Sequence, residues 1–490
     1  MIALAAACTL AGCADDAPDP DPDPQALSVA ASDANTELGN LIDGAPDLVV
    51  AGEPLNAGLL RRFYARHNFE PVWNTRQAQA NSLVNAVWRA DDQGLDPELF
   101  HANLLWQTAA LSLLDHELLL SDAFLSYADA LARGAVPVER RGDDQTLTPG
   151  PVDVAAALDA AIDSPDPAAL IEALAPTTPT YRALRQALQK YRSGTAVAVI
   201  EAMAPTTVAY RATPTYRALR HGLQRHRSGT PAGDEATANR LRTIEVNLER
   251  QRWLPRQLPT DRVWVNVADE RVVLYRADQP VFSTPVIVGE DVKRNQSPEF
   301  RATIEGIEFN PPWRIPSDIA AREIMPKIRH DPDYLMRNDM VILPDGGVEQ
   351  LPGPDAGLGL LMFYMPNRFD VYLHDTPDKY LFNRDDRRIS HGCIRVQDPR
   401  ELAALLMQKP IDTINQAIVM GGTTLSNLSP PVPVFVVYQT AFADADGTLQ
   451  FRRDFYDRDA EIWQQLHRRS PGRDRVAQTD NRRKPPGPFS

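Results

Sequence analysis

The stretch Ser-His-Gly-Cys-Ile-Arg-Val at residues 390–396 decides how this chain is interpreted, because it contains Cys393, the single cysteine after residue 13. A second segment, Tyr-Leu-His-Asp-Thr-Pro at residues 372–377, places His374 nineteen residues before that cysteine. The runs at 369–374 and 394–396 are both typical of strands. The two segments therefore predict a β-rich region in which a thiol and imidazoles can meet.

One thiol flanked by two histidines indicates an activated nucleophile. A free cysteine has a pKa near ~8.5 and is mostly protonated at neutral pH, so the reactive thiolate needs a partner that takes its proton. His391 lies two residues before Cys393 and shares a face with it on an extended backbone. A loop could equally bring His374 back beside the thiol. Spacing alone does not choose between the two imidazoles.

Other groups are predicted to converge on the same thiol. On strands, Tyr372 shares a face with His374, and Arg395 shares a face with Cys393. A guanidinium binds carboxylates in a bidentate manner, so Arg395 favours a substrate that carries one. Glycine permits close approach of the backbone, and the N–H of Gly392 or of Cys393 would stabilise an oxyanion.

Two non-catalytic alternatives compete with this interpretation. Zinc accepts Cys and His ligands but usually takes three or four, and no CxxC pair or HxxxH helix supplements Cys393, His391 and His374. The other alternative is a buried structural cysteine, since free cysteines are often buried. The polar neighbours of Cys393 argue against it. We therefore expect neither a metal nor an organic cofactor.

The composition is that of an acidic protein with ample material for hydrophobic cores. The chain has 490 residues, of which 43% are hydrophobic, and a net charge of −14. This length suggests two or three domains. The acidity argues against a general nucleic-acid binder, which would be basic, so we expect no nucleic-acid partner.

The first residues resemble an export signal. Residues 1–12 are small and mostly apolar, and Leu-Ala-Gly-Cys at residues 10–13 resembles the lipobox of bacterial lipoproteins, in which Cys13 carries the lipid. The resemblance implies a membrane-anchored lipoprotein in the periplasm of a Gram-negative-type envelope. In that oxidising compartment, the unpaired Cys393 stands out as a reactive thiol.

The remaining sequence divides into regions that predict an α+β multidomain protein. The predicted regions are an Asp/Pro-rich tether at 13–46, a mainly helical domain at 47–250, a β-rich, sandwich-like domain at 260–445, a C-terminal extension of that domain at 446–467 and a basic disordered tail at 468–490. Helical segments are expected at 111–120 and 121–132. An internal duplication relates residues 171–195 to 200–230.

The motifs around the thiol resemble the active-site signature of the L,D-transpeptidases, in which an upstream histidine precedes Ser/Thr-x-Gly-Cys followed by Ile-Arg. Other stretches resemble the longer branch of that family, including Val-Ile-Val-Gly at 286–289, Phe-Asn-Pro-Pro-Trp at 309–313 and Gly-Leu-Asp-Pro at 94–97. The resemblance implies a helical scaffold domain followed by a cysteine-dependent catalytic domain.

The resemblance also implies roles for individual residues. Cys393 would be the nucleophile and His374 its base, oriented by the backbone carbonyl of Asp375. Tyr372 and the amides of Gly392 and Cys393 would stabilise the oxyanion. The other residues of the motif, which would support the site or bind substrate, are Ser390, His391 and Arg395.

The implied reaction is acyl transfer on bacterial peptidoglycan without a cofactor. A thioester formed between Cys393 and one stem peptide would be attacked by the side-chain amine of a second stem, giving a 3→3 cross-link, and carbapenem-type β-lactams would acylate the same thiol. Water or a protein lysine as acceptor would make the protein an L,D-carboxypeptidase or an enzyme that attaches protein to the wall. A non-catalytic wall-binding lipoprotein is the alternative from another class. We expect a working site to lower the pKa of its thiol.

Overall fold

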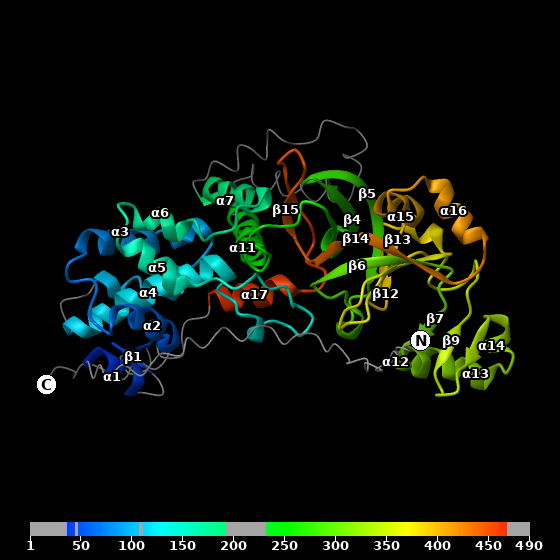
Figure 1. Ribbon diagram of the computed structural model, residues 1–490, viewed down its shortest axis with the longest axis horizontal. Helices are drawn as coiled ribbons and strands as arrows, with labels where there is room; N and C mark the ends of the chain where they lie inside the picture. The colour runs from blue at the N-terminus through cyan, green and yellow to red at the C-terminus, as the bar shows by residue number, and fades with distance from the viewer. Residues whose placement is uncertain (1–36, 45–47, 107–110, 193–231, 468–490) are drawn as a thin grey trace, which may run out of the picture.

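The computed structural model describes residues 37–44, 48–106, 111–192 and 232–467. Helices make up most of the N-terminal half and strands most of the C-terminal half, and Figure 1 shows the two at opposite ends of an elongated molecule. The predicted signal segment, Cys13, the second copy of the duplication and the basic tail lie outside the described residues. None of the described helices is long and apolar enough to span a membrane.

The N-terminal domain is a cluster of amphipathic helices. For example, α2 buries Leu59, Leu60 and Phe63 and leaves Arg61 in solvent. The elements of this domain are α1 (Glu37–Gly44), β1 (Val49–Val50), β2 (Glu53–Pro54), α2 (Ala57–Tyr64), α3 (Gln77–Trp88), α4 (Leu113–Arg133), α5 (Val154–Ile162), α6 (Pro167–Glu172) and α7 (Pro179–Arg192).

Two predictions for this region were wrong. The tether was predicted to run to residue 46, but residues 37–44 form α1, because Leu38 and Ile42 recur at helical spacing and pack into the domain core. The helical segments expected at 111–120 and 121–132 are one helix, α4, which Ser112 caps by accepting a hydrogen bond from the amide of Asp115.

A buried charged triad lies under the same helices. His101 is 6% exposed, and its Nε2 lies 3.0 Å from Asp122 Oδ2 while its Nδ1 lies 3.7 Å from Glu53 Oε2. Burial alone would lower the pKa of this imidazole, but the two carboxylates outweigh it and raise the pKa to about 9. His101 is therefore held as a cation between two acids.

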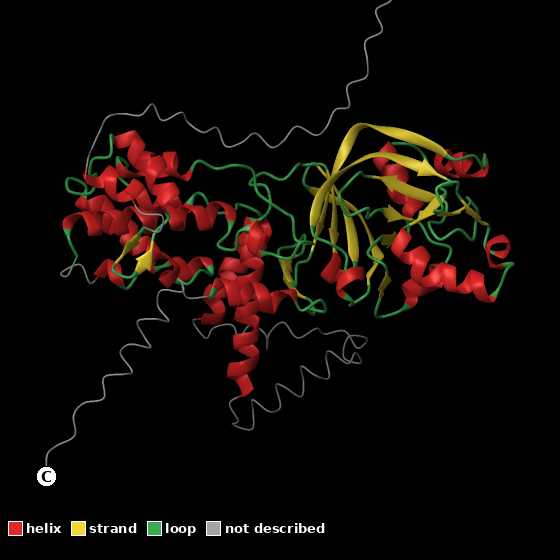
Figure 2. Ribbon diagram, turned by 90° about the horizontal axis from the view of Figure 1, so that it is seen from below, coloured by secondary structure: helices red, strands yellow, loops and turns green. Residues whose placement is uncertain are grey.

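The C-terminal domain is built on a nine-stranded sheet with the strand order β12-β5-β13-β11-β10-β6-β14-β3-β4. Strand β5 also pairs with β4, so the sheet curls back on itself around a core and has two facing layers (Figure 2). The strands are β3 (Arg262–Asn266), β4 (Arg271–Arg276), β5 (Gln279–Gly289), β6 (Phe300–Phe309), β10 (Leu361–Tyr364), β11 (Leu373–His374), β12 (Arg388–Ser390), β13 (Ile394–Val396) and β14 (Thr424–Val437).

Alternation along the strands separates a core face from a second face. Leu373, Ile394 and Phe363 belong to the buried core, together with Leu402 of α15. Helices α15 (Pro399–Met407) and α16 (Ile411–Val419) cover the sheet on that side. Because successive side chains point to opposite faces, the neighbours of these core residues point to the other side.

An insert between β6 and β10 forms a small separate lobe with its own apolar cluster, which includes Ile315, Ile324 and Val348. It follows β6 in the chain and lies at the lower right of Figure 1. Its elements are β7 (Trp313–Ile315), α12 (Ser317–Ile319), a π-helical turn (Ala320–Ile324), α13 (Met325–His330), α14 (Tyr334–Arg337), β8 (Met340–Ile342) and β9 (Val348–Gln350).

Polar and apolar contacts connect the helical domain to the strand-rich domain. Helix α11 (Ala232–Arg252) contacts the strand domain, where Asn247 Nδ2 donates to Thr440 Oγ1 at 2.7 Å. The predicted C-terminal extension at 446–467 contains β16 (Leu449–Phe451), which pairs with the preceding β15 (Ala441–Ala443), and helix α17 (Arg458–Leu466). Ile462 and Leu466 of α17 belong to the core of the helical domain. The extension therefore joins the domains rather than continuing one of them.

Candidate active site

The register of two short parallel strands brings the predicted site residues together. Leu373 of β11 pairs with Ile394 of β13, and His374 pairs with Arg395. Since Leu373 and Ile394 point into the core, His374 and Arg395 share the opposite face. Extending the same register one residue toward the start of both strands places Tyr372 beside Cys393. The backbone bond from Ile394 N–H to Tyr372 O, 2.9 Å, holds the alignment.

Cys393 lies in the turn between β12 and β13. The residue is partly exposed, and its Sγ donates to the carbonyl of Asp370 at 3.8 Å. His374 is its diagonal neighbour across the parallel β11–β13 pair, so the two side chains lie on the same face of neighbouring strands. The fold therefore brings the imidazole of His374 and the thiol of Cys393 to one face of the sheet, on neighbouring strands.

The ring of His374 is held in one orientation. Its Nδ1 lies 2.6 Å from the carbonyl oxygen of Asp375, so Nδ1 carries the proton and donates it, and Nε2 keeps its lone pair. Asp375 is fixed in turn: its carboxylate accepts from the amides of Leu360 (3.0 Å) and Thr376 (2.8 Å). Gly359, with φ of +63°, passes so close that a Cβ there would lie 2.6 Å from Asp375 Cβ.

The protonation states differ from the sequence prediction. Burial raises the pKa of the Cys393 thiol, against the opposing effects of the Tyr372 backbone and the Arg395 charge. Burial and, to a smaller extent, the Arg395 charge lower the pKa of His374 to about 4, against the opposing effects of Asp375 and the Leu358 backbone. The prediction of a lowered thiol pKa is therefore wrong for the free protein, because desolvation disfavours both charged forms. The resting pair is a neutral thiol beside a neutral imidazole.

Hydrogen bonds from two serine hydroxyls fix the turn that carries the thiol. Ser390 Oγ donates to the carbonyl of Cys393 at 2.6 Å and accepts from the amide of Gly392 at 3.1 Å. Ser297 Oγ donates to the carbonyl of Gly392 at 2.8 Å and accepts from the amide of Gly289 at 3.0 Å. Gly392 has a φ of +119°, which explains the glycine.

This turn leaves one amide for an oxyanion. The Gly392 amide already has Ser390 as its partner. Within the described part of the chain, the N–H of Cys393 donates to no other protein group. Of the two predicted oxyanion donors, the Cys393 amide is thus the one that is available.

A buried ion-pair network extends from this turn into the domain joint. Arg458 of α17 is 3% exposed and donates to the carbonyl of Ser297 at 3.1 Å. It also pairs with Glu299, 1% exposed, at 3.4 Å and with Asp144 of the helical domain. Tyr456 adds a bond from its hydroxyl to the carbonyl of Gly289 at 2.6 Å. The scaffold side of the molecule therefore supports the backbone behind the nucleophile.

The remaining predicted residues lie at the edges of the site. Arg395 is 22% exposed and lies 3.8 Å from Asp378, so its guanidinium is partly neutralised. His391 points away from the thiol toward the insert, where its Nε2 contacts Glu323 Oε1 at 2.6 Å. This contact favours His374 over His391 as the base. The phenol of Tyr372 has a raised pKa because of burial and nearby negative groups.

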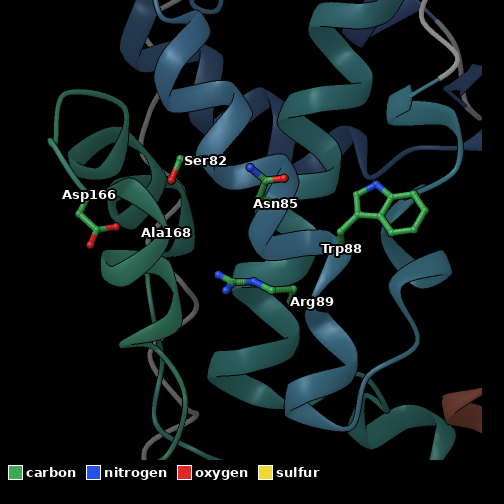
Figure 3. Close-up of a pocket in the computed structure, with 6 residues that line it drawn as sticks. All are labelled: Ser82, Asn85, Trp88, Arg89, Asp166 and Ala168. Atoms are coloured by element: carbon green, nitrogen blue, oxygen red, sulfur yellow. The ribbon is translucent and has the colours of Figure 1, made fainter.

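A separate cavity of about 580 Å³ lies in the helical domain, between α3 and the start of α6. Figure 3 shows its lining residues, which are Ser82, Asn85, Trp88, Arg89, Asp166 and Ala168. It is at the far end of the molecule from β13 (Figure 1), and neither cysteine nor histidine lines it. Among the described residues, no three His, Cys, Asp or Glu side chains gather as a metal site.

Sequence reasoning missed the supporting residues. Ser297, Tyr456 and Arg458 stand far from the motif in the chain and belong to no recognisable pattern. Glu323 was also missed, because the insert that carries it has no signal in the sequence that places it against the catalytic turn. The raised and lowered pKa values were missed because burial cannot be measured from spacing.

Comparison with known proteins identifies two domains in the chain. Residues 58–188 match a family model described as a scaffold domain, and residues 260–432 match one described as an L,D-transpeptidase catalytic domain. A Haemophilus influenzae protein, provisionally named an L,D-transpeptidase, is 29% identical over 248 residues, which are 46% of this chain and 50% of that protein. The chain thus matches about half the length of that curated relative.

Two solved structures show remote similarity. One is the Ldtfm–avibactam carbamoyl enzyme, at 12% identity and a TM-score of 0.19, covering 36% of this chain and 49% of the other. The second is an Enterococcus faecium L,D-transpeptidase mutant in which serine replaces a cysteine, at 11% identity and the same TM-score, covering 36% and 50%. Superpositions this weak add nothing to the geometry described above. The two matched family models show that this chain contains a scaffold domain followed by an L,D-transpeptidase catalytic domain, in the order expected from the sequence.

Proposed function

We propose that this protein is a peptidoglycan L,D-transpeptidase that forms 3→3 cross-links through a thioester on Cys393. One observation carries the proposal. The proposal is supported by the parallel register of β11 and β13, which puts Cys393, Tyr372, His374 and Arg395 on one face, and by the hydrogen bond that fixes the tautomer of the His374 ring. This is the nucleophile, base and orienting group that covalent acyl transfer requires.

The neutral resting pair sets the order of events. As Cys393 Sγ attacks the carbonyl between the diamino acid at position three and D-alanine four, its proton passes to Nε2 of His374. The Cys393 amide stabilises the oxyanion. The C–N bond then breaks, and D-alanine leaves with the proton from His374. Proton transfer accompanies attack because burial disfavours a preformed thiolate.

The second half restores the enzyme. The side-chain amine of another stem attacks the thioester and gives a proton to His374. A new amide bond forms, the C–S bond breaks, and the departing thiolate takes the proton back. Water or a protein lysine in place of that amine gives a carboxypeptidase or a protein–wall linkage by the same steps.

The same proposal includes a location. Peptidoglycan lies outside the inner membrane, so we propose a periplasmic protein attached to a membrane through lipid on Cys13. The lipobox-like residues 10–13 support this part of the proposal. Metabolic labelling with a radioactive fatty acid tests it, since Cys13→Ser should abolish the label.

Product analysis tests the reaction. The full chain and Cys393→Ala are incubated with purified muropeptides, and the products are separated and weighed. We expect 3→3 dimers and free D-alanine from the wild type only. Tripeptides without dimers would identify a carboxypeptidase, and no change in any muropeptide would contradict acyl transfer. A carbapenem should add its mass to the wild type, and an adduct that survives Cys393→Ala would contradict the assignment of the nucleophile.

A further inference from the structure

The site face of the sheet continues beyond His374 and reaches a carboxylate two strands away. His374 of β11 pairs with Met362 of β10, and Met362 pairs with Glu308 of β6. Because paired residues share a face, the four residues Arg395, His374, Met362 and Glu308 form one row across neighbouring strands. With roughly 5 Å between strands, the row spans roughly 14 Å. It has a guanidinium at one end and a carboxylate at the other.

The Glu308 carboxylate has no protein partner to balance its charge. The residue is half-buried, and no hydrogen bond or ion pair reaches its side chain from the described residues. A desolvated charge without a partner is unfavourable, and burial accordingly raises the pKa of this carboxyl. Such groups persist at functional sites, where a ligand supplies the missing charge.

Glu308 also lies within electrostatic range of the catalytic residues. Burial is the largest cause of the raised pKa of the Tyr372 phenol. Nearby groups raise it further, in the order Asp370, Cys393, Tyr364 and Glu308. The phenol is therefore within electrostatic range of both the thiol and this carboxylate. A substrate acylated on the thiol and extended along the row would bring its side chain toward Glu308.

We propose that Glu308 binds the side-chain ammonium of the diamino acid in the donor stem peptide, at the far end of the row from Arg395. This inference rests on the proposed function and names the group that the same site recognises. The side chain of a diamino acid is roughly as long as that of lysine, is flexible and ends in an ammonium. This side chain and that of Glu308 together span the two strand spacings between His374 and Glu308. Met362 supplies an apolar floor for the methylenes of the stem.

Binding measurements test the proposal without requiring turnover. In the full chain with Cys393→Ala, a tetrapeptide donor with a free side-chain ammonium is compared with the same peptide acetylated on that amine, by titration calorimetry. Acetylation should weaken binding about tenfold, the effect of losing one charge-assisted pair. Adding Glu308→Gln should weaken binding of the peptide with the free ammonium about tenfold as well, and should leave binding of the acetylated peptide unchanged. Glu305→Gln, an exposed carboxylate on the same strand, is the matched control and should change neither.

Stability provides a second readout. Removing an unpaired, half-buried charge should raise the unfolding temperature of the free protein or leave it unchanged, whereas a structural role for Glu308 would lower it. The proposal is overturned if Glu308→Gln weakens the binding of both peptides equally, or weakens the binding of neither. If the protein forms no 3→3 products but still binds the peptide with the free ammonium more tightly than the acetylated one, the proposed reaction is refuted and this subsite is not.

Discussion

Ser297→Ala tests whether the catalytic turn depends on support from behind. The Ser297 hydroxyl bridges two buried backbone groups, the carbonyl of Gly392 and the amide of Gly289. Leaving a buried donor or acceptor unsatisfied costs about 1–3 kcal/mol. The two together predict a loss of about 2–6 kcal/mol, a large share of the ~5–15 kcal/mol by which domains are stable.

Urea unfolding at a fixed pH measures the stability. If the dependence of the unfolding free energy on urea keeps its slope, a shifted midpoint reports a change in stability alone. Carbapenem acylation of the folded protein, followed by intact mass, reports on the position of Cys393. We expect Ser297→Ala to unfold at lower urea and to acylate at least tenfold more slowly under conditions where it remains folded. Ser297→Thr keeps the hydroxyl and should recover part of the rate.

Ser283→Ala on the exposed side of β5 is the matched control, and we expect its stability to change by less than ~0.5 kcal/mol. A Ser297→Ala protein that matches the wild type in both urea midpoint and acylation rate would refute the bridge. If stability falls and the acylation rate of the folded variant does not, the bridge stabilises the domain without positioning the thiol.

Three further predictions follow from individual sites. Gly359→Ala should reduce D-alanine release at least tenfold, because its Cβ would displace Asp375 and with it the carbonyl that orients the base, and wild-type kcat would contradict this. His101 should make stability depend on pH, because its pKa is raised from 6.5 to about 9. The contribution is complete below pH 6.5 and lost as pH rises through 9, about 3 kcal/mol in all. The difference in urea midpoint between wild type and His101→Gln should shrink over that range, and a constant difference would contradict the cation. Alkylation of Cys393 by iodoacetamide should have its pH midpoint above the ordinary value of ~8.5, because burial raises the thiol pKa, and a midpoint below about 8 would refute the neutral resting pair.

Local pattern was enough for much of the fold. The mainly helical region and the β-rich region expected from the sequence contain α2 and β3, respectively. Both signals depend on side-chain periodicity, which neighbouring residues alone determine. Boundaries were less accurate where the same periodicity continued past a weak signal, as in α1 and α4.

Residues close in the chain also determined the chemistry of the site. Cys393 and Arg395, and separately Tyr372 and His374, share faces because side chains on a strand alternate, whatever the surrounding fold. What tertiary structure alone decided was the alignment of those two segments, through the pairing of Leu373 with Ile394. It also decided the protonation of the pair and the partners Ser297, Glu308 and Arg458. Desolvation and contacts between distant segments depend on the packed core, and no feature of the separate segments encodes them.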